Sequence, residues 1–144
     1  MTHRREELRV AGLAEPISHY TDAVRSGGLL FLSGIVPVDG EGKLVGEGDV
    51  VEQTRQVFRN MELVLRAAGC GFGDVVKVTT FLLDISDRAR INPVRQEVFG
   101  DARPASTLVE VSALAVPGAL LEIEAVAAIP SRGAGAAGQS PTAR

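Results

Sequence analysis

The chain has few of the residues that form disulfides, metal sites or cofactor sites. Its 144 residues include one cysteine, two histidines, one tyrosine and no tryptophan. The single cysteine excludes an internal disulfide and fits a reducing compartment. His3 and His19 have no partner at a spacing typical of metal ligands, so no metal site is predicted. The glycine-rich segment 40–48 lacks the Lys-Ser/Thr ending of a phosphate-binding loop, and we expect no cofactor.

The sequence also lacks a basic block and a long apolar run. Its 15 Lys and Arg residues are scattered among 18 Asp and Glu residues, giving a formal net charge of −3. This balance argues against a nucleic-acid surface. No apolar segment follows the charges at the N-terminus, and no stretch is long enough to span a membrane. We therefore expect a cytoplasmic protein that binds neither nucleic acid nor membranes.

Aliphatic residues dominate, and their pattern predicts a single domain. The chain is 45% apolar but only 4% aromatic, so its core must consist of Val, Leu, Ile and Ala. The length is that of one domain with a sizeable core. Alternation and apolar runs predict strands over 18–24, 29–36, 75–83, 103–111 and 120–127. The small, polar tail over 131–144 is predicted to be disordered, which leaves 1–130 as the domain.

Two helices are predicted. Asp49 is a suitable N-cap for the first, with Glu52 at the capping-box spacing and Gly69 or Gly71 at the end. The second helix is predicted between 86 and 99, and Pro93 places its first turn near Asn92. Apolar residues of the first helix repeat on one face, as expected for core packing: Val57, Phe58, Met61, Val64, Leu65 and Ala68.

These elements predict an α+β fold, with one mixed sheet and both helices on one of its faces. Apolar residues point to both sides of the segments 75–83 and 120–129. Since two helices can cover only one face, the other face needs a partner. Self-association through the sheet is the simplest solution, and we expect a homo-oligomer.

Carboxylates interrupt the two last strand-like segments, which a Pro117-Gly118 turn separates. Burying a charge in a strand is unfavourable unless the charge is paired or used in function. Glu122 is therefore the first candidate for chemistry. Glu124 follows on the same face of a regular strand, whereas Glu110 is most simply part of a structural ion pair.

Taken together, the motifs resemble the reactive intermediate deaminase family, also called Rid or YjgF. The resemblance spans about residues 17–129, and the order and spacing of its pieces make it specific. The pieces are Tyr20, Ala23-Val24, Leu32-Ser33-Gly34, Pro37, the segments 53–69 and 73–77, Asn92, Pro104-Ala105, Val109-Glu110-Val111 and Glu122-Ile123-Glu124-Ala125. The resemblance implies a chorismate-mutase-like homotrimer, with a small-molecule substrate in each cleft between subunits. It also implies hydrolysis of enamines and imines to a keto acid and ammonia, without a cofactor.

The resemblance assigns roles to individual residues. Glu122 matches the acid that positions or activates the attacking water, although a carboxylate paired at a subunit contact is an alternative. Tyr20 matches a cleft tyrosine, with core packing as its alternative. Asn92 matches a cleft residue but would serve equally well as a helix cap. Ser33 could supply a hydroxyl, and Gly34 a close backbone approach or a bulge.

The chain departs from the family pattern at Ser106. Family members carry an arginine directly after Pro-Ala, which holds the substrate carboxylate, and a serine hydroxyl cannot replace it. Arg103 or Arg95 could reach the cleft instead, or the substrate has no carboxylate there. We rank the third explanation first, because strand alternation puts Arg103 on the face opposite Ser106. Seven residues are assigned to substrate binding: Tyr20, Ser33, Gly34, Asn92, Arg103, Ser106 and Leu108.

The leading hypothesis is therefore a hydrolytic deaminase of enamines or imines whose substrate class has shifted from 2-imino acids. An aminomuconate-type enamine is one candidate substrate. The alternative is a non-catalytic trimer that binds a small metabolite or makes a regulatory contact.

Overall fold

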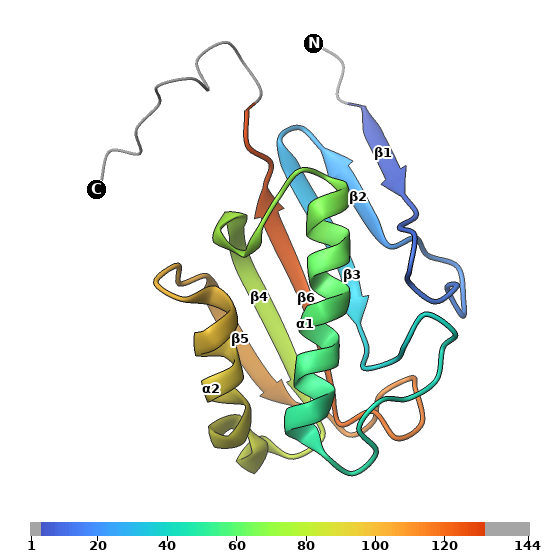
Figure 1. The fold of residues 1–144 in the computed structure, drawn as a ribbon, viewed down its shortest axis with the longest axis vertical. Coiled ribbons are helices and arrows are strands. Elements are labelled where there is room, and N and C mark those ends of the chain that lie inside the picture. The colour runs from blue at the N-terminus through green and yellow to red at the C-terminus, as the bar shows by residue number, and fades with distance from the viewer. Residues whose placement is uncertain (1–3, 132–144) are drawn as a thin grey trace.

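The computed structural model describes residues 4–131 (Figure 1). Six strands and two α-helices occur in the order β1 (Arg5–Leu8), β2 (Ala23–Ser26), β3 (Leu29–Ile35), α1 (Val50–Ala67), β4 (Val75–Leu82), α2 (Arg88–Phe99), β5 (Ala105–Glu110) and β6 (Leu121–Ala128). Short 3-10 turns at Phe72–Asp74 and Ile85–Asp87 precede β4 and α2. All but the first residue of the predicted tail over 131–144 lie outside the described residues.

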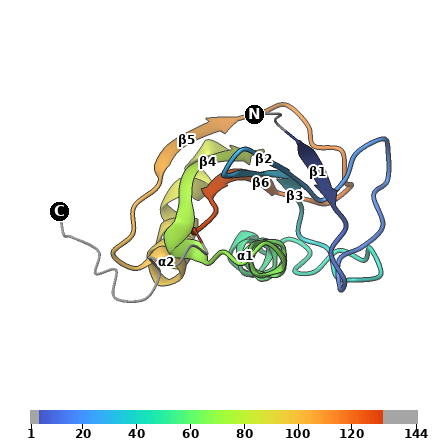
Figure 2. The ribbon, with the colours of Figure 1, turned by 90° about the horizontal axis from the view of Figure 1, so that it is seen from above.

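The strands form one sheet in the order β1-β2-β3-β6-β4-β5. The β4–β5 pair is parallel and the other neighbouring pairs are antiparallel, so the sheet is mixed as predicted. Figure 2 shows α1 and α2 on the same side of the sheet. The predicted α+β class and the placement of both helices on one face are confirmed.

Helix α1 begins and ends where its sequence signals predict. The Asp49 carboxylate accepts hydrogen bonds from the N–H groups of Val51 and Glu52, both at 3.1 Å. At the other end, Gly69 has a φ of +75°, and the Cys70 N–H donates to the Leu65 carbonyl at 2.8 Å. This is a Schellman ending, in which the residue after the glycine packs back on the helix. Cys70 is therefore a buried structural residue, and burial raises the pKa of its thiol.

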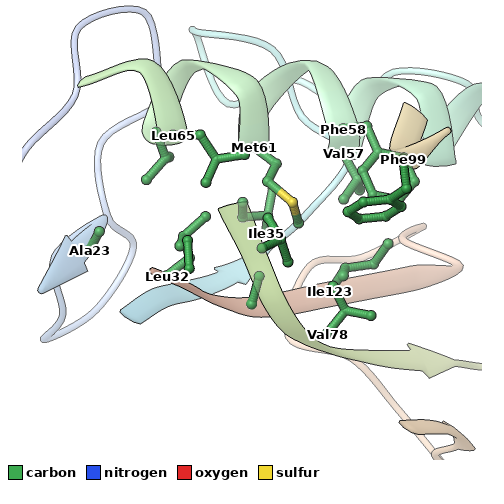
Figure 3. Close-up of a cluster of buried hydrophobic side chains, with 14 of the residues drawn as sticks. Ala23, Leu32, Ile35, Val57, Phe58, Met61, Leu65, Val78, Phe99 and Ile123 are labelled. Atoms are coloured by element: carbon green, nitrogen blue, oxygen red, sulfur yellow. The ribbon is translucent and has the colours of Figure 1, made fainter. Parts of the chain in front are cut away.

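The core lies between α1 and the sheet (Figure 3). Every residue of the predicted helix stripe is buried, and the ring of Phe58 makes edge-to-face contacts with the rings of Phe72 and Phe99. The stripe faces buried aliphatic side chains of the central strands, among them Leu32, Ile35, Val78 and Ile123. Aliphatic packing with one small aromatic cluster matches the composition.

Two predicted elements were misplaced. The segment 18–24 is not a strand: β2 begins only at Ala23, and the edge of the sheet is β1, whose charged residues carry no apolar strand signal. The second helix begins at Arg88 rather than near Asn92. Its preceding turn is capped by Asp84, whose carboxylate accepts from the Ser86 N–H at 2.9 Å. Pro93 lies inside the helix on an exposed side, where water can reach the carbonyl that proline leaves unbonded.

The sheet face away from the helices, here called the open face, carries exposed apolar side chains. Phe31 is 44% exposed, Leu29 40% and Val109 38%. A hollow of about 230 Å³ on this face is lined in part by Phe31, Lys77 and Glu124. Among residues 4–131, no helix is long and apolar enough to cross a membrane.

Candidate functional site

Glu122 lies on the open face of β6, where it contacts the backbone of β3. It pairs with Phe81 of β4 across the sheet. On its other side the β3–β6 register shifts between Leu32 and Ile35, which confirms the bulge considered for Gly34. A Cβ atom at Gly34 would lie only 1.9 Å from Glu122 Oε2. Gly34 thus provides a close approach, and the group that approaches is the Glu122 carboxylate.

The Glu122 carboxylate is partly buried and accepts no hydrogen bond from residues 4–131. Burial raises its pKa, and the negative charge of Glu124, on the same face, raises it further. A carboxylate with a raised pKa and unused acceptor atoms is well suited to exchange a proton with a water molecule or a ligand. No Lys or Arg of residues 4–131 pairs with the Glu122 carboxylate, so the alternative of a pair at a subunit contact stays a prediction.

Tyr20 and Ser33 belong to the same part of the molecule. The Ser33 hydroxyl donates to the Thr21 carbonyl at 2.6 Å, which ties the segment after Tyr20 to the bulge. Tyr20 is 46% exposed, so core packing is not its role, and its hydroxyl accepts from the Ile17 N–H at 3.3 Å. We call Tyr20, Ser33, Gly34 and Glu122 the Glu122 group.

A second set of predicted residues meets where α2 covers β5. Arg95 Nη2 donates to Ser106 Oγ at 2.8 Å. Asn92 is exposed and lies one helical turn before Arg95. Because α2 begins at Arg88, Asn92 is inside the helix and is not its cap. Leu108 follows Ser106 on the same side of β5 and is partly buried. We call Asn92, Arg95, Ser106 and Leu108 the Arg95 group.

Two single-residue predictions need correction. Arg103 is exposed in the segment before β5, so strand alternation does not fix its direction, and it belongs to neither group. Glu110 is not in an ion pair among the described residues. Its carboxylate accepts from the Ile85 N–H at 2.9 Å and thereby holds the turn before α2.

The two groups do not form one site within a chain. Ser106 is level with Val78, whose side chain faces the helices, whereas Glu122 is level with Phe81 on the open face. The strand spacing and rise place the backbones of Ser106 and Glu122 about 14 Å apart, with β4 between them. A small substrate cannot contact both groups of the same chain across the sheet.

Sequence reasoning missed Gln53, which positions the start of β6. Its side chain is fully buried; Nε2 donates to the carbonyls of Gly46 and Gly118 at 3.0 Å each. Its Oε1 accepts from the Leu120 N–H at 2.7 Å, two residues before Glu122. The available signal was a polar residue one turn before Val57, on the apolar face of the helix. Among residues 4–131, no group of three or more potential metal ligands occurs.

Comparison with known proteins identifies the family. A family model described as Endoribonuclease L-PSP matches residues 12–129. A RutC family protein of Pyrococcus horikoshii is 41% identical over 123 residues, which is 85% of this chain and 97% of the relative. A crystal structure of YyfA, from the conserved Rid protein family of Yersinia pestis, is 34% identical with a TM-score of 0.83, covering 88% of this chain and 100% of that one. The chain belongs to the Rid family.

A further solved structure, E. coli TdcF with bound serine, is 31% identical with a TM-score of 0.78. The match covers 85% of this chain and 98% of that chain. The resemblance found in the motifs is thus confirmed over nearly all of the described residues. Membership of this family supports a general role in enamine and imine deamination.

Proposed function

We propose that this Rid protein hydrolyses imines formed from amino acids, after their enamine precursors have tautomerised. Water adds to the C=N carbon, the resulting carbinolamine loses its nitrogen as ammonia, and a carbonyl compound remains. Glu122 accepts a proton from the attacking water and returns a proton to the departing nitrogen. No redox step occurs, so the reaction requires no cofactor.

The observation that carries this proposal is the environment of Glu122. Its carboxylate is partly buried, has no donor among residues 4–131, and has its pKa raised by burial and by Glu124. A pKa closer to the working pH makes the carboxylate a better base and makes its acid form more available. The contact with Gly34 limits where the carboxylate can go, and defined placement is what general base catalysis requires.

The proposal includes a homotrimer whose substrate cleft lies between subunits. The Glu122 group and the Arg95 group lie on opposite faces of one chain, and a neighbouring copy can bring the two together. The exposed apolar side chains of the open face, such as Phe31 and Leu29, support burial against other copies. Each cleft then takes the Glu122 group from one subunit and the Arg95 group from the next.

An amino-acid-like substrate fits the site better than the shifted substrate class predicted from Ser106. TdcF, a relative with the same fold, has been crystallised with bound serine. In this chain, Arg95 brings a positive charge to Ser106, so the absence of an arginine at position 106 does not imply an uncharged substrate. Nothing in the site selects an aminomuconate-type enamine.

The decisive experiment measures ammonia release from 2-iminobutanoate, which threonine dehydratase generates in situ, above the spontaneous rate. We expect wild type to accelerate release and Glu122→Gln to abolish the acceleration while the oligomer, measured by light scattering, stays intact. Glu124→Gln is the matched control on the same strand: it should retain kcat and move the acid limb of the pH profile to lower pH.

Three results would count against the proposal. Full activity in Glu122→Gln would remove Glu122 from the mechanism, and a monomeric active protein would remove the shared cleft. No activity in wild type, together with protection of the protein against heat by 2-oxobutanoate, would favour the non-catalytic binding protein.

A further inference from the structure

Arg95 stands apart from the other arginines of the described chain. Among residues 4–131, it is the only arginine that is partly buried and has no carboxylate within salt-bridge distance. The arginines nearest in sequence differ, since Arg90 contacts Asp87 and Arg88 is exposed. Burial of the Arg95 guanidinium lowers its pKa, with no nearby acid to offset the effect. Partly buried cations normally have an anionic partner.

The single hydrogen bond of Arg95 directs it to one place. Arg95 Nη2 donates to Ser106 Oγ at 2.8 Å, so the guanidinium lies against the residue that stands where the family has its arginine. The Ser106 oxygen acts as acceptor in this bond, which leaves its O–H free to donate. The remaining N–H groups of Arg95 have no acceptor among residues 4–131. Both side chains therefore present unused donors next to one another, at an exposed position on β5.

We propose that Arg95 and Ser106 together bind the carboxylate of the substrate, so that the anion is held from α2 instead of from the strand. Arg95 supplies the charge and Ser106 a second donor. The inference rests on the proposed function for the identity of the substrate, but not for the existence of an anion site. Arg95 is thus a specificity-determining residue that selects acids over uncharged imines.

The kinetic test compares Arg95→Ala with Arg88→Ala, a matched loss of charge from the same helix. With 2-iminobutanoate, Arg95→Ala should raise KM about 10- to 100-fold with a smaller change in kcat, as expected for a lost charged hydrogen bond. Arg88→Ala should leave both constants unchanged. Arg95→Lys should be intermediate, because it keeps the charge and loses the planar fork. In the double variant Arg95→Ala, Ser106→Arg, the strand arginine should restore the lower KM, which a merely structural role for Arg95 cannot explain.

A binding test separates this inference from the proposed function. The keto acid 2-oxobutanoate should raise the melting temperature of wild type but not of Arg95→Ala, and the uncharged 2-butanone should raise neither. Stabilisation of wild type alone by 2-oxobutanoate would support the anion site even if no deamination occurs. Deamination in wild type with an unchanged KM in Arg95→Ala would overturn the inference while the proposed function stands. Equal stabilisation of both proteins would overturn it as well.

Discussion

Replacing Gly34 with alanine tests whether the position of the Glu122 carboxylate matters for catalysis. The new Cβ atom would lie 1.9 Å from Glu122 Oε2 and 2.8 Å from its Cδ, whereas ordinary van der Waals contact begins near 3.4 Å. The carboxylate must therefore move by about 1.5 Å. The atoms that clash are at the end of a flexible side chain, so the backbone of β3 and β6 can remain in place.

The substitution should lower activity strongly and leave stability almost unchanged. A displacement of about 1 Å at a reacting group lowers rates by about 100-fold, so we expect kcat for 2-iminobutanoate to fall by about 100-fold or more. Gly34 does not have a positive φ, so alanine is tolerated by the backbone. The loss of glycine freedom in the unfolded chain favours the variant by about 0.4–1 kcal/mol. Moving one side chain costs a similar amount, and the free energy of unfolding should change by less than about 1 kcal/mol.

The assay combines ammonia release, chemical denaturation and light scattering on Gly34→Ala and on a control, Gly73→Ala. A Cβ at Gly73 meets no atom within 4 Å, and Gly73 lies far along the chain from the site. The control should match wild type in ammonia release and in light scattering, and should be more stable by at most about 1 kcal/mol, through the loss of glycine freedom in the unfolded chain. Wild-type kcat in a well-folded Gly34→Ala variant would refute this expectation, since the carboxylate would then tolerate displacement. A large loss of stability would show that the backbone moved instead of Glu122.

Other positions give sharp expectations. Glu122→Gln should be at least as stable as wild type at neutral pH. The pKa of Glu122 is higher in the folded state than in the unfolded state, so wild type loses stability as the pH rises from the lower pKa to the higher one. Glutamine does not titrate, so the variant does not lose this stability. Denaturation curves from pH 4 to 8 check this, and a gap that widens toward acid pH would contradict it. Wild-type activity should fall as pH drops through the raised pKa. Gln53→Leu should cost about 2–4 kcal/mol, or about 10 °C in Tm, because it removes three hydrogen bonds and leaves the Gly118 carbonyl and the Leu120 N–H without their partner; an unchanged Tm would mean that water replaces the amide. Thr80→Val should stabilise the protein by about 1 kcal/mol, because the Thr80 hydroxyl is fully buried without a hydrogen bond; destabilisation in urea would indicate an internal water bound to it.

Elements with strong local signals were predicted well. The strands β3, β4 and β6 are apolar runs of strand length, and α1 has both a cap and an apolar stripe, so local sequence is sufficient to define them. The strand β1 was missed because Arg5-Glu6-Glu7 has no apolar alternation. It forms through backbone pairing with β2. The segment that follows β1 is held by Asp22, which is distant from it in sequence. The buried Asp22 carboxylate accepts from the Val10 N–H at 2.7 Å and pairs with Arg9.

The candidate site was predictable in its residues but not in its arrangement. Glu122 and Gly34 were identified singly, yet nothing in the sequence showed that they touch. Their contact depends on the register between β3 and β6, and the register shifts at the bulge. Arg95 is one of two possible substitutes for the missing arginine, and a substrate without a carboxylate ranks above both; the direction of Arg95 depends on where α2 begins. Placing the first turn near Asn92 instead of at Arg88 obscured the approach of Arg95 to β5.

The two groups have an electrostatic feature in common that links assembly with activity. Glu122 is a partly buried carboxylate without a donor, and Arg95 is a partly buried guanidinium without an acid, each considered among residues 4–131. Each group is unfavourable for the chain that carries it, and the two cannot compensate one another in the same chain, because β4 lies between them. In the proposed trimer, each cleft contains Glu122 of one subunit and Arg95 of the next, with the substrate between them. The substrate carboxylate contacts Arg95, and the imine carbon contacts the water that Glu122 holds. A bound ligand should therefore stabilise the proposed trimer by more than expected from the surface area that the ligand buries. Dilution that dissociates the trimer into monomers should abolish activity while the chain is still folded.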